Sequence, residues 1–229
     1  MCKGLNHYRE LIGSMPLDEQ TTVARMDIWG DKLVRAGCSD LLVRLGTNCW
    51  HEDRGMIEIS RHDLFRLAQR EKGITRRLIL AVFIWGYPTG GQGNNCFEMI
   101  DNIKRIAQAF ADVGPRNGMG QEDVNELFAS LRGSGIGLST CTKLLYFGSF
   151  KVGGYDALIL DNKVIRACKR GLFEEFAELS GITYDNGKAR YETYLRVMSE
   201  VARNLGVENP AKLEMFLFLF GNSLKGHRC

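Results

Sequence analysis

The sequence of 229 residues predicts an all-α protein, and three observations support this prediction. Apolar residues recur at helical spacing over most of the chain. Residues 74–85 are apolar on nearly every side after Arg77, which is typical of a helix buried at the centre of a core. Two more helical patterns are joined directly by the glycine-dense turn of residues 131–137. Together these patterns indicate roughly eight to ten helices packed around a common core.

The composition fits a globular protein in a reducing compartment. A hydrophobic content of 45% is enough for a core, and a net charge of +3 allows a local nucleic-acid surface without indicating one. The seven cysteines stand singly, with no C-x-x-C pair, so neither a disulfide framework nor a zinc site is indicated. The start of the chain has no apolar signal core, and the longest apolar run, residues 78–85, is too short to cross a bilayer. We therefore expect a cytoplasmic protein without membrane association.

The first half of the chain predicts further helices and one irregular segment. Residues 17–37 alternate apolar and charged positions at helical spacing up to Gly37, which suits a helix C-terminus. Residues 41–59 mix glycines with short apolar pieces and indicate a loop with at most a short strand or helix. Ser60, with Asp63 three positions later, is a suitable N-cap for a helix that runs to about Lys72. Residues 97–110 are amphipathic and predict another helix.

The segment from Arg61 to Arg77 is strongly basic. It contains six Arg or Lys residues against two acidic ones, and several of the basic residues recur at roughly helical spacing. A solvated helix face explains such a run and is the interpretation that we favour. Contact with a DNA backbone is the alternative.

The remaining segments complete the set of helices. Residues 86–95 are too rich in glycine for a helix and predict a loop directly after the buried segment. Apolar positions at helical spacing predict a helix that starts near Asp161, and two more at residues 191–205 and 213–220. No internal repeat or low-complexity segment is present.

The glycine-dense turn is the most informative stretch of the chain. Gly133, Gly135 and Gly137 stand just before a helix start, where glycine permits positive φ and close approach of another backbone. Several N–H groups at such a start have no helical partner, so the turn predicts a phosphate contact. The spacing fits neither the Rossmann fingerprint nor the P-loop, both of which require a preceding strand. A nucleotide cofactor is therefore not indicated.

The sequence Gly135-Ile136-Gly137-Leu138-Ser139-Thr140 resembles the hairpin of the helix-hairpin-helix DNA glycosylase superfamily. In that superfamily the hairpin is followed by a catalytic aspartate in a short apolar context, and the segment Ile159-Leu160-Asp161-Asn162-Lys163-Val164 resembles that of the adenine glycosylases. The resemblance implies a two-lobed fold with a cleft between the lobes, and a hairpin at residues 121–147. The expected lobes are residues 38–130, and residues 1–37 together with 131–229.

The resemblance also implies a role for Asp161. Cleavage of an N-glycosidic bond builds positive charge on the sugar, which a nearby carboxylate stabilises. The alternative is that Asp161 only caps a helix, and the two roles are compatible. Some relatives also carry a lysine nucleophile two positions after the last hairpin glycine, where this chain has Ser139. A hydroxyl cannot form an imine, so we expect a monofunctional glycosylase that uses water. Lys143, one helical turn later, is the nearby amine that could replace the lysine.

The same resemblance implies roles for other positions. The hairpin residues Gly133, Gly135, Gly137, Ser139 and Thr140 are candidates for DNA binding, as are Gln92 and Asn94, whose side chains would fill the gap left by an extruded nucleotide. A structural turn is an equal alternative for residues 86–95. Residues 219–224 resemble the C-terminal segment of the 8-oxoguanine glycosylases, in which a phenylalanine stacks on the extruded base. Phe220, with Phe216, is the match, and a core role is the alternative.

Taken as a whole, the chain resembles small bacterial proteins of the 8-oxoguanine glycosylase fold, some of which occur beside antiviral defence genes. We expect a monomer that binds double-stranded DNA and excises a modified base, such as 8-oxoguanine. Partner proteins of a defence system are a further expectation. No metal and no iron–sulfur cluster are expected, because the closely spaced cysteines of endonuclease III are missing, although the hairpin could hold a monovalent cation. The competing function is a binding module that recognises nucleic acid or a modified nucleobase without cleavage.

Overall fold

The computed structural model describes residues 4–41, 50–51, 55–90, 95–113 and 118–224. The chain forms two compact units. We call Met1–Leu17, Pro115–Asn125 and Ser149–Cys229 the terminal unit, and Asp18–Gly114 and Glu126–Gly148 the central unit. In these units, residues 18–37 and 131–148 group with residues 38–114.

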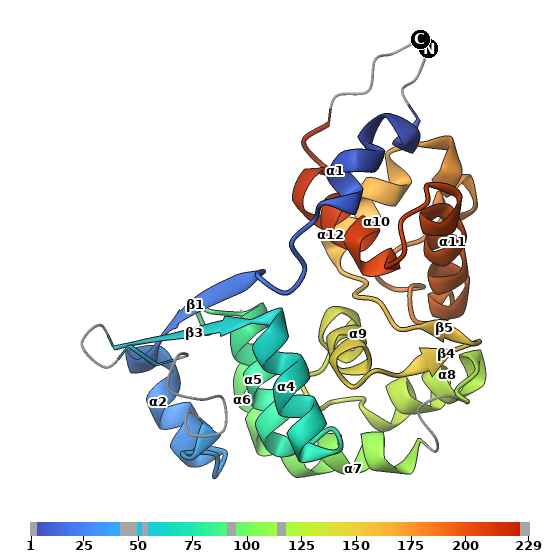
Figure 1. Ribbon diagram of the computed structural model, residues 1–229. Helices are drawn as coiled ribbons and strands as arrows, with labels where there is room; N and C mark the ends of the chain where they lie inside the picture. Colours follow the sequence, from blue (N-terminus) through green and yellow to red (C-terminus); the bar gives the residue numbers. More distant parts are fainter. Residues whose placement is uncertain (1–3, 42–49, 52–54, 91–94, 114–117, 225–229) are drawn as a thin grey trace. The chain divides into compact units, whose positions relative to one another are not determined.

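The described residues are mostly helical, as expected (Figure 1). The helices of the central unit are α2 (Met26–Arg35), α4 (Arg61–Glu71), α5 (Arg76–Gly86), α6 (Asn95–Asp101), α7 (Ile103–Asp112) and α9 (Leu138–Phe147). Those of the terminal unit are the 3-10 helix η1 (Leu5–Tyr8), α1 (Arg9–Gly13), α10 (Asn162–Lys169), the 3-10 helix η4 (Glu174–Leu179), α11 (Tyr191–Asn204) and α12 (Pro210–Phe220). Helix α8 (Gln121–Ser130) begins in the terminal unit and ends in the central one. No helix in the described ranges is long and apolar enough to span a membrane.

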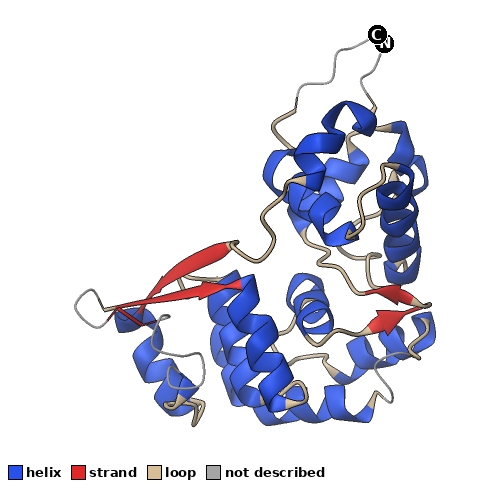
Figure 2. Ribbon diagram, viewed as in Figure 1, coloured by secondary structure: helices blue, strands red, loops and turns tan. Residues whose placement is uncertain are grey.

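Two small sheets accompany the helices (Figure 2). A short strand was expected only within residues 41–59, where β2 and most of β3 lie. In the central unit, β1 (Thr21–Arg25), β3 (Met56–Ser60) and β2 (Trp50–His51) form an antiparallel sheet in the order β1-β3-β2. The expectation of one helix over residues 17–37 was therefore wrong in its first part. Thr21, Thr22 and Val23 favour a strand, and the pairing of buried Ala24 with Ile57 gives this strand a partner that helical periodicity does not reveal.

Helix α4 begins where the sequence predicted. The hydroxyl of Ser60 accepts a hydrogen bond from the backbone N–H of Asp63, and the carboxylate of Asp63 accepts one from the N–H of Ser60, so the pair forms a capping box. The helix ends at Lys72, which has a φ of 55° in the left-handed region. The next helix, α5, is the buried helix expected at residues 74–85, with every residue from Leu78 to Trp85 buried. Helix α5 packs against α4, α7 and α9 and forms the core of the central unit.

The glycine turn joins α8 to α9, as predicted. Gly133 and Gly135 have φ values of 71° and 77°, a region that side-chain-bearing residues rarely adopt, so glycine is required at both positions. Gly137 differs, because it has an extended conformation and is the N-cap of α9. All ten residues of α9 are buried, and the helix packs against α4 and α5.

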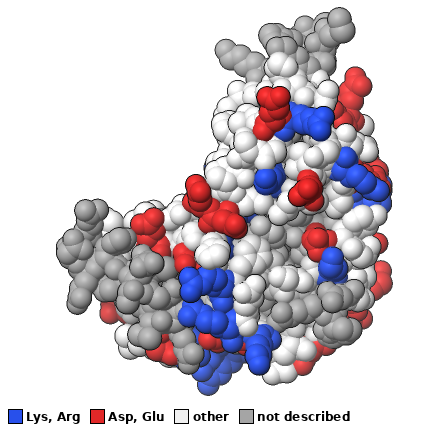
Figure 3. Space-filling view, viewed as in Figure 1, with Lys and Arg blue, Asp and Glu red and all other residues white. Residues whose placement is uncertain are grey.

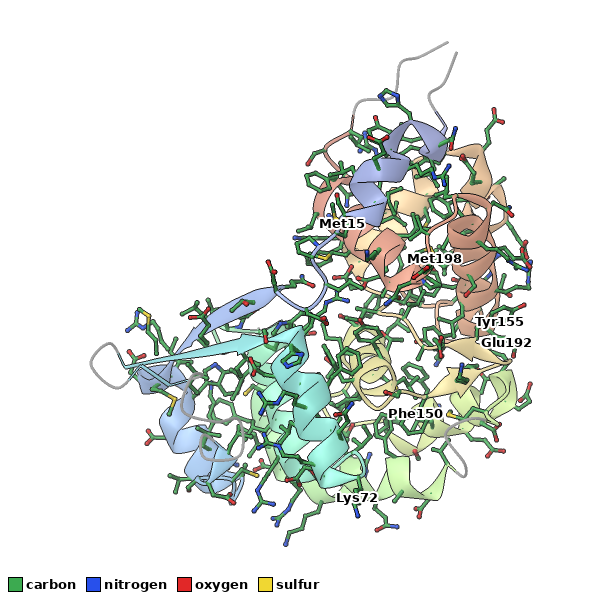
Figure 4. The ribbon with its side chains drawn as sticks, viewed as in Figure 1. Met15, Lys72, Phe150, Tyr155, Glu192 and Met198 are labelled. Atoms are coloured by element: carbon green, nitrogen blue, oxygen red, sulfur yellow. The ribbon has the colours of Figure 1, made fainter. Side chains whose placement is uncertain are left out.

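The segment between the hairpin and Asp161 folds as a second hairpin, made of β4 (Lys151–Val152) and β5 (Tyr155–Asp156). Gly153 and Gly154 form its turn, with φ values of 59° and 82°. A Cβ at residue 153 would lie 2.5 Å from the Oε1 atom of Glu192, so the turn fits closely against the start of α11. Tyr155 of β5 and Glu192 of α11 lie side by side (Figure 4). The chain then runs to Asp161 through residues 157–160, which belong to no helix or strand.

Candidate functional site

The central unit brings together the start of α9 and the end of α5. Ser139, Thr140 and Lys143, all proposed from sequence, are 8%, 2% and 7% exposed. The hydroxyl oxygens of Thr140 and Tyr87, the C-cap residue of α5, lie 3.2 Å apart, within hydrogen-bond distance. Tyr87 was not identified as a site residue from sequence. Its position directly after the buried helix, at the start of the expected loop, is the signal that could have identified it.

Lys143 reaches back along α9 toward Ser139. Its Nζ atom donates a hydrogen bond of 2.6 Å to the Oγ atom of Ser139 and lies 5.5 Å from the centre of the Tyr87 ring. A Cβ at Gly86 would lie 3.3 Å from the Cε atom of Lys143, so the glycine at the end of α5 leaves room for the lysine stem. No carboxylate forms an ion pair with Lys143 in the described part of the chain. The amine is therefore held by a hydroxyl and a ring face.

The hairpin presents backbone donors at the start of α9. The first helical N–H with a backbone partner is that of Cys141, which bonds to the carbonyl of Gly137. The N–H groups of the three preceding residues lie ahead of the helical ladder, where an anion can accept from them. Because the side chains of Ser139 and Thr140 are buried, we expect the backbone N–H groups of the hairpin to make any contact with phosphate.

Asp161 is the N-cap of α10 in the terminal unit. Its Oδ1 atom accepts hydrogen bonds from the backbone N–H groups of Lys163, at 2.8 Å, and Val164, at 3.0 Å. Its Oδ2 atom has no hydrogen-bond partner among the residues described. One carboxylate oxygen thus fixes the orientation of the side chain at the helix start, and the other is available to water or substrate. The capping role and the catalytic role weighed from sequence are compatible in this geometry.

The two phenylalanines proposed for the base pocket differ in exposure. Phe216 is fully buried against Tyr8, whereas Phe220, at the end of α12, is 37% exposed and lies 5.8 Å from Phe216 between ring centroids. Phe216 therefore contributes to the core of the terminal unit, and Phe220 is the member of the pair that a base could reach. A Cβ at Gly221 would lie 2.5 Å from the Cβ of Ala167, so α12 packs closely on α10 just after Phe220.

The remaining predicted residues give no site geometry. Gln92 and Asn94 lie outside the described residues. Cys38, Cys96, Cys141 and Cys168 are free and buried, and burial raises the pKa of the Cys168 thiol to about 12. Among the described residues, no group of three or more His, Cys, Asp or Glu side chains is arranged to hold a metal ion.

Helix α4 carries a band of positive charge on its exposed side. Arg66 and Arg70 lie one turn apart and are exposed, and exposed Lys72 and Arg76 follow them. Lys and Arg side chains gather along this part of the central unit (Figure 3). Arg77 differs from the band, because it is paired with Asp40 at 2.6 Å.

A comparison with protein families identifies the chain. The model of a family described as "Putative 8-oxoguanine DNA glycosylase OGG-like protein" matches residues 16–218. The chain belongs to this family. The match to the OGG-like family includes both the glycine hairpin and Asp161. No curated protein and no solved structure matches the chain.

Proposed function

We propose that this OGG-like protein is a DNA glycosylase that extrudes a damaged or modified base from double-stranded DNA and releases it by hydrolysis. The observation that supports the proposal most directly is Asp161, which follows the hairpin in sequence and keeps one carboxylate oxygen free of the α10 cap. The family description supports an oxidised purine such as 8-oxoguanine as the substrate class.

In the proposed reaction, the bond between C1′ of the sugar and the base nitrogen breaks, and the base leaves with the bonding electrons. The negative charge of Asp161 stabilises the positive charge that develops on the sugar. Water then adds to C1′ and loses a proton, for which the free Oδ2 atom of Asp161 is a suitable acceptor. The N–H groups at the start of α9 hold a phosphate of the DNA backbone, and Phe220 stacks on the extruded base.

Lys143 supports a second candidate chemistry. Its Nζ atom lies 2.6 Å from the side chain that occupies the family's lysine position, so an amine is available where the resemblance places a nucleophile. Attack of a neutral amine on C1′ would displace the base with the bonding electrons and, after loss of a proton from the nitrogen, leave an aminal. Cleavage of the C1′–O4′ bond, with a proton going to O4′, would then give the imine that permits strand cleavage.

The decisive experiment incubates the protein with duplexes that each carry one modified base, followed by alkali. Release of a base with strand breakage only after alkali is the expected result. Strand breakage without alkali, together with an adduct trapped by borohydride, would support the lysine chemistry. Specific binding of a modified duplex without base release would indicate a binding module and would contradict the proposed function.

A further inference from the structure

The four residues before Asp161 form a buried segment that follows β5 directly. Ala157, Leu158, Ile159 and Leu160 belong to no described helix or strand, and each is at most 3% exposed. Buried backbone N–H and C=O groups must be paired. Two side chains supply partners for Leu158 and Ile159.

Tyr191 and Tyr194 supply these partners from α11. The hydroxyl of Tyr191 donates to the carbonyl of Leu158 at 2.6 Å and accepts from the N–H of the same residue at 3.2 Å. The hydroxyl of Tyr194 donates to the carbonyl of Ile159 at 2.9 Å. One end of the segment is also fixed, because the N–H of Ala157 donates to the carbonyl of Phe150 at 2.9 Å. The two hydroxyls thus satisfy buried backbone groups of Leu158 and Ile159.

The two tyrosines form a rigid pair. They stand three positions apart on one face of α11, both are fully buried, and their rings are stacked with centroids 6.1 Å apart. Burial, with a smaller contribution from nearby Glu214, raises the pKa of Tyr194 well above its usual value of 10, so this hydroxyl keeps its proton and remains a donor.

We propose that Tyr191 and Tyr194 are positioning residues for Asp161. The carboxylate of Asp161 is held from one side by the N–H groups of α10, and its backbone is held from the other side by the segment that the tyrosines fix. Hydrogen bonds to backbone carbonyls set the segment's position along the chain direction, which apolar contacts alone do not fix. The inference rests on the proposed function, because it concerns the orientation of the catalytic carboxylate.

The test compares Tyr194→Phe and Tyr191→Phe with the wild type in base release. Each change removes a hydroxyl and keeps the ring. A displacement of Asp161 by a fraction of an ångström should lower kcat by about tenfold while KM stays unchanged, because the DNA contacts are elsewhere. Tyr8→Phe is the matched control: Tyr8 belongs to the same unit and packs on Phe216, and its hydroxyl forms no hydrogen bond among the described residues. This variant should release the base at the wild-type rate.

A double variant separates positioning from a structural role. In the Asp161→Asn background, Tyr194→Phe should cause no further loss of kcat, since both changes act through the same carboxylate. Amide hydrogen exchange at Lys163 and Val164 gives a readout that does not depend on activity, and protection there should fall in Tyr194→Phe but not in Tyr8→Phe.

The outcomes distinguish the positioning role of the tyrosines from the proposed function. Wild-type kcat and unchanged protection in both tyrosine variants would overturn the positioning role and leave the proposed function standing. An equal loss of kcat from Tyr194→Phe in the wild-type and Asp161→Asn backgrounds would also overturn it. Absence of base release by the wild-type protein would remove the proposed function and the positioning role with it. Full activity of Asp161→Asn would remove Asp161 from the mechanism, and with it the positioning role, and would leave the glycosylase activity standing.

Discussion

Replacement of Asp161 separates helix capping from catalysis, because asparagine and alanine remove different parts of the side chain's function. Asparagine keeps an oxygen that can accept the hydrogen bonds from Lys163 and Val164, now 2.8 and 3.0 Å long. Alanine removes this acceptor. Both variants lose the negative charge.

The two changes should therefore differ in stability and agree in activity. Loss of an N-cap to alanine costs about 1 kcal/mol in the free energy of unfolding, whereas asparagine costs only about a few tenths, mainly from the lost charge at the helix start. For a protein of this size, about 1 kcal/mol corresponds to a decrease in Tm of roughly 2–4 °C. Loss of the carboxylate should lower the rate of base release by about two to three orders of magnitude in both variants.

The assay measures thermal unfolding by circular dichroism and base release under single-turnover conditions, with DNA affinity as the control. Asp161→Asn should retain the wild-type Tm and DNA affinity and lose activity. If Asp161→Asn released the base at the wild-type rate while Asp161→Ala lost only stability, Asp161 would be a helix cap and nothing more.

Three further predictions concern the hairpin, the lysine and a buried thiol. Gly137→Asp should weaken DNA binding for all sequences in a titration at fixed salt, with no loss of Tm, because Asp is a good N-cap and the extended φ of residue 137 accepts a side chain. Equal affinity would make the hairpin purely structural. Borohydride should trap no adduct in the wild type if water is the nucleophile, and an adduct that Lys143→Gln abolishes would establish the amine chemistry. The raised pKa of Cys168, about 12, means that the unfolded chain loses this proton first, so the free energy of unfolding should fall between about pH 9 and 12 in denaturant titrations. In Cys168→Ala, the free energy of unfolding should fall less over this pH range. The same pH dependence in this variant and the wild type would contradict the prediction.

Features encoded by local sequence were predictable. The capping box of α4 depends on Ser60 and Asp63 alone, and the glycine turn depends on φ values that only glycine adopts easily. The buried helix α5 was visible because its residues are apolar on all sides. Each of these three signals lies within one continuous stretch of sequence, so none required knowledge of distant contacts.

Features that depend on distant partners were not predictable in the same way. The strand β1 exists because β3 pairs with it from more than thirty positions later, and the apolar spacing around it also fits a helix. The tyrosines of α11 look like ordinary core residues of an amphipathic helix, and only their contacts with Leu158 and Ile159 reveal their relation to Asp161. The spacing of apolar residues identifies which face of a helix or strand is buried. It does not identify which other segment of the chain that face contacts.

Lys143 shows why position in sequence and position of a functional atom must be kept apart. In sequence, this lysine lies one helical turn, about 5.4 Å, beyond the position of the family's nucleophile. Side chains of a helix lean toward its N-terminus, and an extended lysine spans a distance comparable with one turn. The Nζ atom accordingly lies 2.6 Å from the Oγ atom of Ser139, in space that the short serine side chain and the glycine at position 86 leave open. The amine therefore lies beside the residue that occupies the family's lysine position, and the borohydride experiment decides between water and Lys143 as the nucleophile.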